Sequence, residues 1–361
     1  MLRRALIVVT SLGLLLATAV SVDARSINAQ NTYTVHNLVS DNFVPGTLHD
    51  PNLVNGWGLT AGPTTPWWLA NNGTNTSTLY NGDGTARSLV VSVHNAPTGA
   101  VFNGTADFVV SSGGASGPAR FIFATEDGTI LGWNPNVPAM GNTDAIQGTS
   151  TAGAIYKGLA IGSSGGANYL YATDFHHARV DVFDKDFHPA TLAGSFDDPG
   201  IPEGFAPFGI QNLNGVIYVT YAKQDADAED EIAGPGLGYV SAFGTDGTFM
   251  ARVASRGELN APWGLAWAPG GTMFGRFSGH LLVGNFGDGR ITGHRLTADG
   301  WEARGLLKGT DHRPISIDGL WGIGFGNGAV NGSGDPHVLY FAAGPDDESH
   351  GLFGSISFSA P

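Results

Sequence analysis

The chain has 361 residues, with 31 Asp and Glu against 17 Lys and Arg, no Cys, 55 Gly and 19 Pro. Its formal net charge of −14 disfavours nucleic acid and anionic membranes as partners, and the lack of Cys excludes disulfides and thiolate chemistry. Because 42% of the residues are hydrophobic, and Gly and Pro separate short apolar runs, the composition indicates an all-β protein with many turns.

Residues 1–24 have the features of a secretory signal peptide. Arg3 and Arg4 precede an apolar stretch at 5–20, and a small residue closes the segment at Ala24, after which we expect cleavage. The mature chain is then secreted or periplasmic and has no membrane span. The alternative is an uncleaved anchor, for which the apolar stretch is short.

A short motif recurs about every 50 residues, and each copy is followed by two further strand-like runs with a polar turn between them. The motif combines a small or aromatic residue, a Gly and an apolar alternation. This period, with three or four strands per unit, is typical of a β-propeller in which each unit forms one blade. The motif begins with NGWGLTAG at Asn55, in a degenerate form near residue 98, with YKGLAIGS at Tyr156, APFGIQNL at Ala206, APWGLAWA at Ala261 and DGLWGIGF at Asp318.

The last unit lacks a fourth strand, because the chain stops at Pro361 soon after GLFGSISF. The strand-like segment 33–41, YTVHNLVSD, precedes the first motif, and we expect it to supply the missing outer strand and close the ring. Residues 25–361 are therefore predicted to form a single six-bladed β-propeller that acts as a monomer. A pair of β-sandwiches is the alternative, and the regular period disfavours it.

The polar residues of the blades should gather at one end of the central axis. The first strand of each propeller blade lines the axis, and the turn between its second and third strands lies at the end where the first strand begins. Every predicted blade places a carboxylate, amide, Lys or His there. The strand starts add Asn55, Lys157 and Asp318, with Trp57, Trp263 and Trp321 as apolar or stacking walls.

Such a ring of polar groups could hold one divalent ion. Carboxylate and amide oxygens favour Ca²⁺, whereas His side chains shift the preference towards Zn²⁺. Either ion polarises a carbonyl or activates a water, and a nearby His or carboxylate serves as general base. The expected metal ligands are Glu126, Asp174, Asn285 and Asp346, and the expected catalytic residues, acting as ligands or proton carriers, are His176, Glu348 and His350.

The turn GPDDESHG at 344–351 is longer than a hairpin needs and gathers three carboxylates and a His. Like charges this close repel one another unless something compensates them. A functional site therefore stands beside a structural alternative, in which Asp346 or Asp347 caps backbone N–H groups or pairs with a cation of the next blade. By contrast, the turn 126–128, Glu-Asp-Gly, also fits ordinary hairpin chemistry.

The segment 225–231 carries five carboxylates. An acidic run of this kind is typical of a solvated loop, and it lacks the Gly and Glu spacing of a calcium-binding EF-hand. Its position beside the predicted axis also suits a lid.

The opening motif resembles that of NHL-type propellers and their gluconolactonase-like relatives. The words FATEDGTI, YATDFH, NAPWGLA, VGNFGDG, IDGLWGIGFGNG and GPDDESHGLFG, found between Tyr33 and Phe358, resemble a family of secreted bacterial propellers without a settled function. The resemblance implies the fold and export.

Fold alone does not decide the function, so three classes remain open. The first is a metal-dependent hydrolase or lyase acting on a small lactone, ester or sugar derivative. The second is a non-catalytic extracellular propeller that binds a protein, a glycan or another surface component. The third is a purely structural protein outside the cell.

Overall fold

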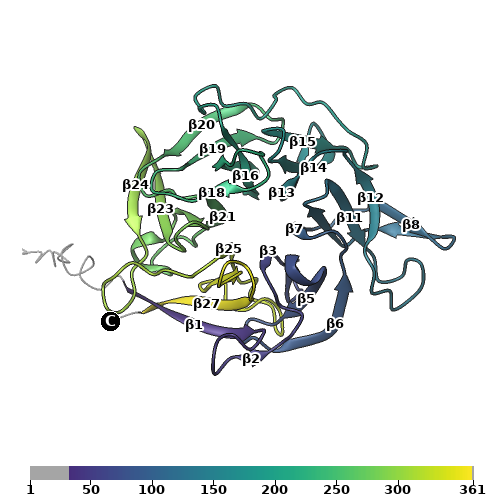
Figure 1. Cartoon of the computed structure of the whole chain (residues 1–361), viewed down its shortest axis with the longest axis horizontal. Coiled ribbons are helices and arrows are strands. Elements are labelled where there is room, and N and C mark those ends of the chain that lie inside the picture. Colours follow the sequence, from purple (N-terminus) through teal and green to yellow (C-terminus); the bar gives the residue numbers. More distant parts are fainter. Residues whose placement is uncertain (1–31, 360–361) are drawn as a thin grey trace, which may run out of the picture.

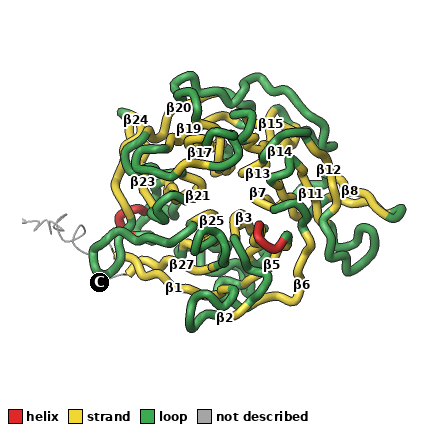
Figure 2. The backbone as a smooth tube through the Cα atoms, in the orientation of Figure 1, coloured by secondary structure: helices red, strands yellow, loops and turns green. Residues whose placement is uncertain are grey.

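The computed structural model describes residues 32–359, and the predicted signal peptide at 1–24 lies outside them. Six sheets, antiparallel except for the β1–β2 pair of the sixth, surround a common centre as the blades of a propeller (Figure 1). Strands and connecting loops make up almost the whole fold, with two short 3₁₀ turns at Asn72–Thr74 and Gly275–Phe277 (Figure 2). Across residues 32–359, helices of the length and hydrophobicity that a bilayer requires are absent.

The innermost strand of each blade begins at the recurring motif, which confirms the six predicted blade openings. These strands are β3 (Gly56–Thr60), β7 (Pro97–Phe102), β13 (Tyr156–Ser164), β16 (Phe205–Leu213), β21 (Pro262–Trp267) and β25 (Leu320–Phe325).

The remaining strands follow outwards in chain order, and the third blade has only three strands. Blade one adds β4 (Trp67–Asn71), β5 (Thr76–Tyr80) and β6 (Ala86–Ser92). Blade two adds β10 (Phe121–Thr125), β11 (Thr129–Trp133) and β12 (Ile146–Ser150). Blade three adds β14 (Ala167–Asp174) and β15 (Arg179–Phe183). Blade four adds β17 (Val216–Gln224), β19 (Gly238–Gly244) and β20 (Phe249–Ser255), and the short strand β18 (Glu231–Ile232) pairs with β17. Blade five adds β22 (Leu281–Asn285), β23 (Ile291–Thr297) and β24 (Gly300–Leu306). The second blade also carries a hairpin of β8 (Val109–Ser112) and β9 (Ala115–Pro118).

The sixth blade joins the two ends of the described chain. Its strands β26 (Leu339–Ala343) and β27 (Leu352–Ser359) are followed outwards by β1 (Thr32–Ser40) and β2 (Leu48–His49). Strand β1 pairs antiparallel with β27 along its length, which confirms that the N-terminal strand closes the ring. Just beyond β1, a carboxylate oxygen of Asp41 lies 2.7 Å from Nδ1 of His350, and Phe43 stacks on the same imidazole.

The Gly of each motif lies where the inner strands of neighbouring blades approach one another. A Cβ at Gly209 would lie 2.1 Å from the carbonyl oxygen of Trp263 in the next blade, and one at Gly99 would lie 2.2 Å from the amide nitrogen of Leu159. Contacts this short exclude any side chain. The six glycines form a closed ring of such contacts around the axis, made of Gly58, Gly99, Gly158, Gly209, Gly264 and Gly322.

Aromatic side chains fill the axis between its two ends. Trp57 and Trp321 stack with ring centroids 3.5 Å apart, and Trp263 packs edge-on against both. Phe208 completes this buried cluster. The axis therefore has two separate ends. We call the end where the inner strands begin the front mouth, and the end where they finish the rear mouth.

Candidate functional site

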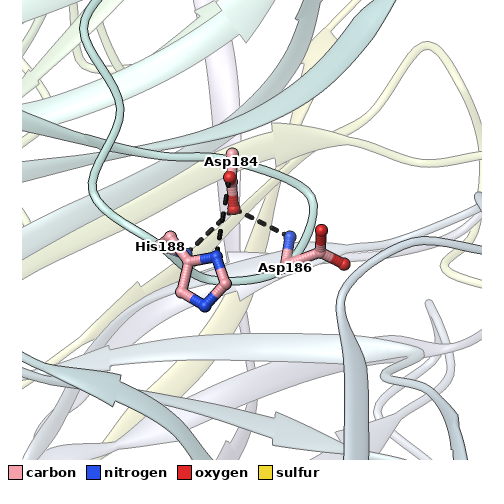
Figure 3. Close-up of side chains that lie close together, drawn as sticks. All are labelled: Asp184, Asp186 and His188. Carbon is pink, nitrogen blue, oxygen red and sulfur yellow. Dashed lines mark hydrogen bonds and ion pairs between the residues drawn. The ribbon is translucent and has the colours of Figure 1, made fainter.

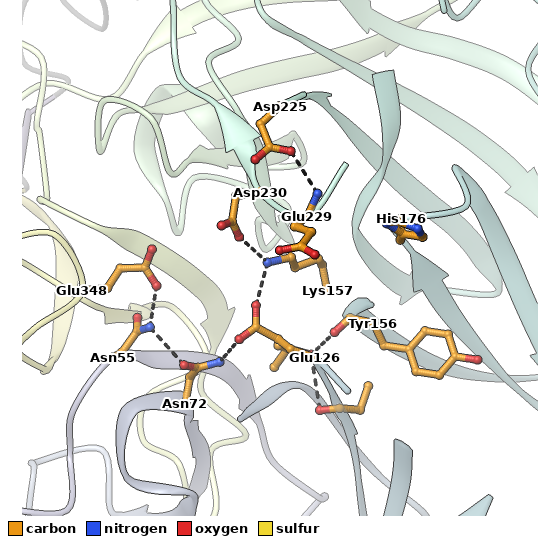
Figure 4. A network of polar contacts seen from close by, with 12 residues as sticks. Asn55, Asn72, Glu126, Tyr156, Lys157, His176, Asp225, Glu229, Asp230 and Glu348 are labelled. Carbon is orange, nitrogen blue, oxygen red and sulfur yellow. Dashed lines mark hydrogen bonds and ion pairs between the residues drawn. The ribbon is translucent and has the colours of Figure 1, made fainter. Parts of the chain in front are cut away.

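A buried lysine lies at the centre of the front mouth, and we call its ammonium and the polar groups around it the hub. Lys157, at the start of β13, is only 1% exposed. Its Nζ donates to Oε1 of Glu126 at 2.6 Å and to Oδ1 of Asp230 at 2.9 Å (Figure 4). The same Nζ lies 5.3 Å from the ring centre of Trp57. One ammonium thus links the turn of blade two and the acidic loop of blade four to blade three.

The two carboxylates keep Lys157 charged. Burial alone would lower the pKa of its ammonium, but the charges of Glu126 and Asp230 outweigh burial and hold that pKa above its ordinary value. A nucleophilic or basic lysine requires the opposite shift. Lys157 therefore serves as a fixed positive charge that orients carboxylates.

Glu348 faces the same hub through a chain of amides. Asn55 donates its Nδ2 to Oε2 of Glu348 and receives a hydrogen bond from Nε1 of Trp321 at 3.0 Å. Asn72 then links Asn55 to Glu126, donating to Oε2 of Glu126 at 2.9 Å. Burial raises the pKa of Glu348, the hydrogen bond from Asn55 opposes that rise, and the charge of Glu126 adds to it.

The backbone of the GPDDESHG turn is strained where it presents Glu348. Asp346, Asp347 and Glu348 all have left-handed φ values, at 56°, 50° and 64°. This conformation costs L-residues about 1–2 kcal/mol each. Asp346 and Asp347 are exposed, and only Glu348 turns towards the hub. Backbone strain that is retained in a turn facing the hub points to a function for the side chain that the turn positions, which is Glu348.

The acidic loop is not simply solvated. The Asp230 side chain is 72% exposed yet bonds to Lys157, and the short strand β18 places Glu231 against β17. Burial raises the pKa of Glu231 to about 8, against the opposing charge of Lys157, and the neighbouring charges of Glu348 and Asp230 raise it further. At neutral pH this raised pKa favours the protonated, uncharged form of Glu231. A lid role for this loop stays a prediction.

Two of the four predicted metal ligands are engaged elsewhere. The fully buried Asp174 accepts a hydrogen bond from the backbone N–H of His177, and its carboxylate lies 2.7 Å from the imidazole of that residue. Asn285, also fully buried, accepts from the backbone N–H of Asn260 and donates to the carbonyl of Glu258. Both side chains satisfy local groups that would otherwise be left unpaired.

The remaining predicted residues are spread around the rim. Glu126 reaches the hub, whereas Asp346 is exposed and its backbone N–H donates to Asp318. The half-buried His176 has its Nδ1 3.2 Å from the carbonyl of Ala228 in the acidic loop. His350 belongs to the ring closure described above. The structure thus brings Glu126 and Glu348 together and does not assemble the predicted four-ligand set.

Within residues 32–359, one group of three acidic or imidazole side chains has its ligand atoms within 4.8 Å of one another. It consists of Asp184, Asp186 and His188 in the turn after β15, and it could hold a metal ion (Figure 3). Asp184 Oδ1 also accepts the backbone N–H groups of Asp186 and His188, both at 2.9 Å, as an ordinary turn requires. The spacing Asp-x-Asp-x-His was the signal for this group in the sequence.

The sequence also held a signal for Lys157. The residue before the motif Gly points at the axis, and it is aromatic in four blades, at Trp57, Phe208, Trp263 and Trp321. Lys157 occupies the same position in blade three. Alignment of the repeats would therefore have marked it as a charge placed on the axis.

No family profile matches the chain. Uncharacterized protein L690 of Acanthamoeba polyphaga mimivirus is 33% identical over 344 residues, covering 90% of this chain and 86% of the viral protein. Uncharacterized protein R648 of the same virus is 31% identical over 345 residues, covering 91% and 81%. This chain belongs to the family of these viral proteins. The matched family members are uncharacterised and viral, so the expected origin among secreted bacterial propellers is not supported.

Solved structures with a similar fold include several enzymes. Virginiamycin B lyase from Staphylococcus aureus has a TM-score of 0.46 at 12% identity, covering 91% of this chain and all of that chain. The soluble aldose sugar dehydrogenase of Escherichia coli gives 0.49 and 13%, with the same coverage. A gluconolactonase from Xanthomonas campestris gives 0.42 and 18%, covering 66% and 72%. Likeness at this level concerns the fold and adds no argument about activity.

Proposed function

We propose that the front mouth is the acid–base site of a hydrolase or lyase acting on a small lactone, ester or sugar derivative. The observation that carries this proposal is a pair of carboxyl groups with raised pKa values, Glu231 and Glu348, beside the permanently charged Lys157. Carboxyl groups whose pKa values are raised towards neutral pH, beside a fixed charge, are typical of general acids and bases.

The two groups differ in the role that each environment favours. Glu231, with a pKa of about 8, is protonated at neutral pH and can give its proton to a leaving oxygen. Glu348 accepts a hydrogen bond from Asn55, which favours its ionised form and suits it to take a proton from substrate carbon or from water. In the reaction Glu231 loses a proton and Glu348 gains one. The pair returns to its starting state when Glu231 takes up a proton from solvent and Glu348 releases one to solvent.

The proposal routes no step through a metal ion at the hub. The Lys157 ammonium already bonds to Glu126 and Asp230, and so supplies the positive charge that a divalent ion would bring there. The group of Asp184, Asp186 and His188 lies in the turn after β15, the outermost strand of blade three, away from the hub.

The test is a screen of lactones, esters and sugar derivatives with the full chain, followed by Glu231→Gln and Glu348→Gln. We expect each variant to lower kcat by about 10²–10⁴-fold. The matched control is Asp347→Asn, which changes an exposed carboxylate in the same turn and should leave kcat unchanged. Chelation by EDTA should also leave kcat unchanged. Activity that survives both Gln variants, or that disappears with EDTA, would contradict the proposal.

A non-catalytic binding propeller is the second candidate. The front mouth gathers Glu126, Asp230, Glu231 and Glu348 around a single ammonium, an excess of acid that suits a ligand bearing a positive charge. Tight binding of an amine ligand without any turnover would favour this candidate over the enzyme.

A further inference from the structure

The rear mouth is hollow. Two adjoining pockets of about 470 and 360 Å³ share Thr60, Ala61, Gln211 and Asn212 in their walls. Together they are lined by the ends of the inner strands of all six blades, so the hollow lies on the propeller axis. The aromatic cluster of Trp57, Trp263 and Trp321 separates it from the front mouth. Both volumes fall within the range of small-molecule sites.

The chemistry of this hollow is the opposite of that at the front mouth. None of the described residues that line either pocket is an Asp, Glu, Lys, Arg or His, although the chain has 31 acidic residues. A charged ligand would lose its hydration there and find no partner of opposite charge. The hollow therefore suits an uncharged ligand.

Polar groups in the wall are free to bind such a ligand. Gln211 lines both pockets and the narrow gap of about 20 Å³ beneath them. Neither its side-chain amide nor the Thr60 hydroxyl has a hydrogen-bond partner among residues 32–359. Gln211 and Thr60 are both partly exposed in the wall of the hollow, so their polar groups are open to a ligand there.

The remainder of the wall is apolar and partly aromatic. Trp267 is half-exposed at the wall of the larger pocket, with Phe325 in the same wall, and Phe102 lines the smaller pocket. Aromatic faces pack against apolar ligand surfaces while leaving polar groups free to pair at the edges. An amide offers both a donor and an acceptor, which a ligand hydroxyl matches in either sense.

We propose that the rear mouth binds an uncharged mono- or disaccharide. A sugar presents hydroxyl groups to Gln211 and Thr60 and an apolar ring face to Trp267, and it carries no charge that the hollow would leave unpaired. An apolar ligand would leave the amide of Gln211 without a partner, and an acidic or basic ligand would be bound without a counter-charge. This site is independent of the acid–base chemistry proposed for the front mouth.

The test measures binding of glucose, galactose, N-acetylglucosamine, maltose and cellobiose to the full chain by saturation-transfer NMR and calorimetry. Glucuronic acid and glucosamine serve as charged counterparts. We expect at least one neutral sugar to bind and both charged sugars to bind more weakly. Gln211→Leu removes the amide at nearly constant size, and we expect it to weaken binding about tenfold, because a ligand hydroxyl loses its partner.

The matched control is Gln147→Leu, which makes the same change on the outer strand β12, far from the axis. Thermal melting of both variants separates a local effect from unfolding. Three results would each overturn the proposal: no transfer to any neutral sugar, equal binding by the two Leu variants, or loss of sugar binding in Glu348→Gln, which would place the sugar at the front mouth.

Discussion

Replacement of Lys157 by Met tests whether the front mouth depends on its buried ammonium. Loss of one partner from a fully buried ion pair costs about 3–5 kcal/mol, whereas an exposed pair contributes about 0–1 kcal/mol. Lys157 is buried, but the Glu126 and Asp230 side chains are 30% and 72% exposed, so water can take up part of their charge. We therefore expect Lys157→Met to lower the free energy of unfolding by about 2–3 kcal/mol.

The assay is denaturation by guanidinium, followed by Trp fluorescence. Lys185→Met is the control, because Lys185 is 55% exposed and pairs with an equally exposed Asp186. That variant should leave the free energy of unfolding almost unchanged, because water and salt screen an exposed ion pair. Equal effects of the two Met variants would refute the reasoning.

A double variant separates charge from packing. In Lys157→Met, the carboxylate of Glu126 is left without its cation, so the further change Glu126→Gln should restore part of the lost stability. If the two changes simply add, the loss in Lys157→Met comes from packing against Trp57 and not from the ion pair.

Three further predictions concern stability. Gly209→Ala should lower the free energy of unfolding by at least about 3 kcal/mol, because its Cβ would lie 2.1 Å from a backbone oxygen of Trp263. Gly270→Ala is the control, because a Cβ there would have nothing within 4 Å, and it should be nearly neutral. Similar midpoints of the two variants in a denaturant titration would contradict the ring of close contacts. Glu231 has a pKa of about 8 in the folded chain and an ordinary value of 4.5, so between pH 4.5 and 8 the native state binds more protons than the unfolded state. The free energy of unfolding should therefore fall as the pH rises through this range, by up to about 1.4 kcal/mol per pH unit. Glu231→Gln should flatten that slope in melts at several pH values, and an unchanged slope would show that other groups cause it. Asp347→Gly should raise the free energy of unfolding by roughly 0.5–1 kcal/mol, because Gly adopts φ of 50° without strain; a loss would mean that the Asp347 side chain stabilises the turn.

The fold was predictable because its constraints repeat along the chain. One Gly per blade is required where inner strands touch, so the motif reports the axis directly in the sequence. The closing strand was also predictable, since the last blade lacks an outer strand and the segment 33–41 is the strand-like run left over. Repetition thus turns a tertiary contact into a pattern that can be counted.

The site was less predictable because polar residue types do not reveal what they bond to. Asp174 and Glu126 occupy comparable turns, yet Asp174 is fully buried and bonded to the backbone of its own turn, whereas Glu126 reaches across to Lys157. The difference depends on burial and on which neighbour supplies a donor. Among the residues predicted for the site, Glu348 lies in a turn with a local sign, its surplus length, and the structure explains that length by three consecutive left-handed residues.

Lys157 and the acidic loop form one electrostatic unit, in which carboxylates compensate a buried positive charge. A lysine at a position that is aromatic in four other blades places a positive charge in a buried layer, and burial alone would make that charge unfavourable. Glu126 supplies one counter-charge, and the insertion in blade four supplies Asp230 and Glu231. These carboxylates exceed what a single ammonium can neutralise, and this excess, together with burial, raises the pKa of Glu231 and Glu348. The proton-exchanging groups at the front mouth are therefore a consequence of how the buried lysine is compensated.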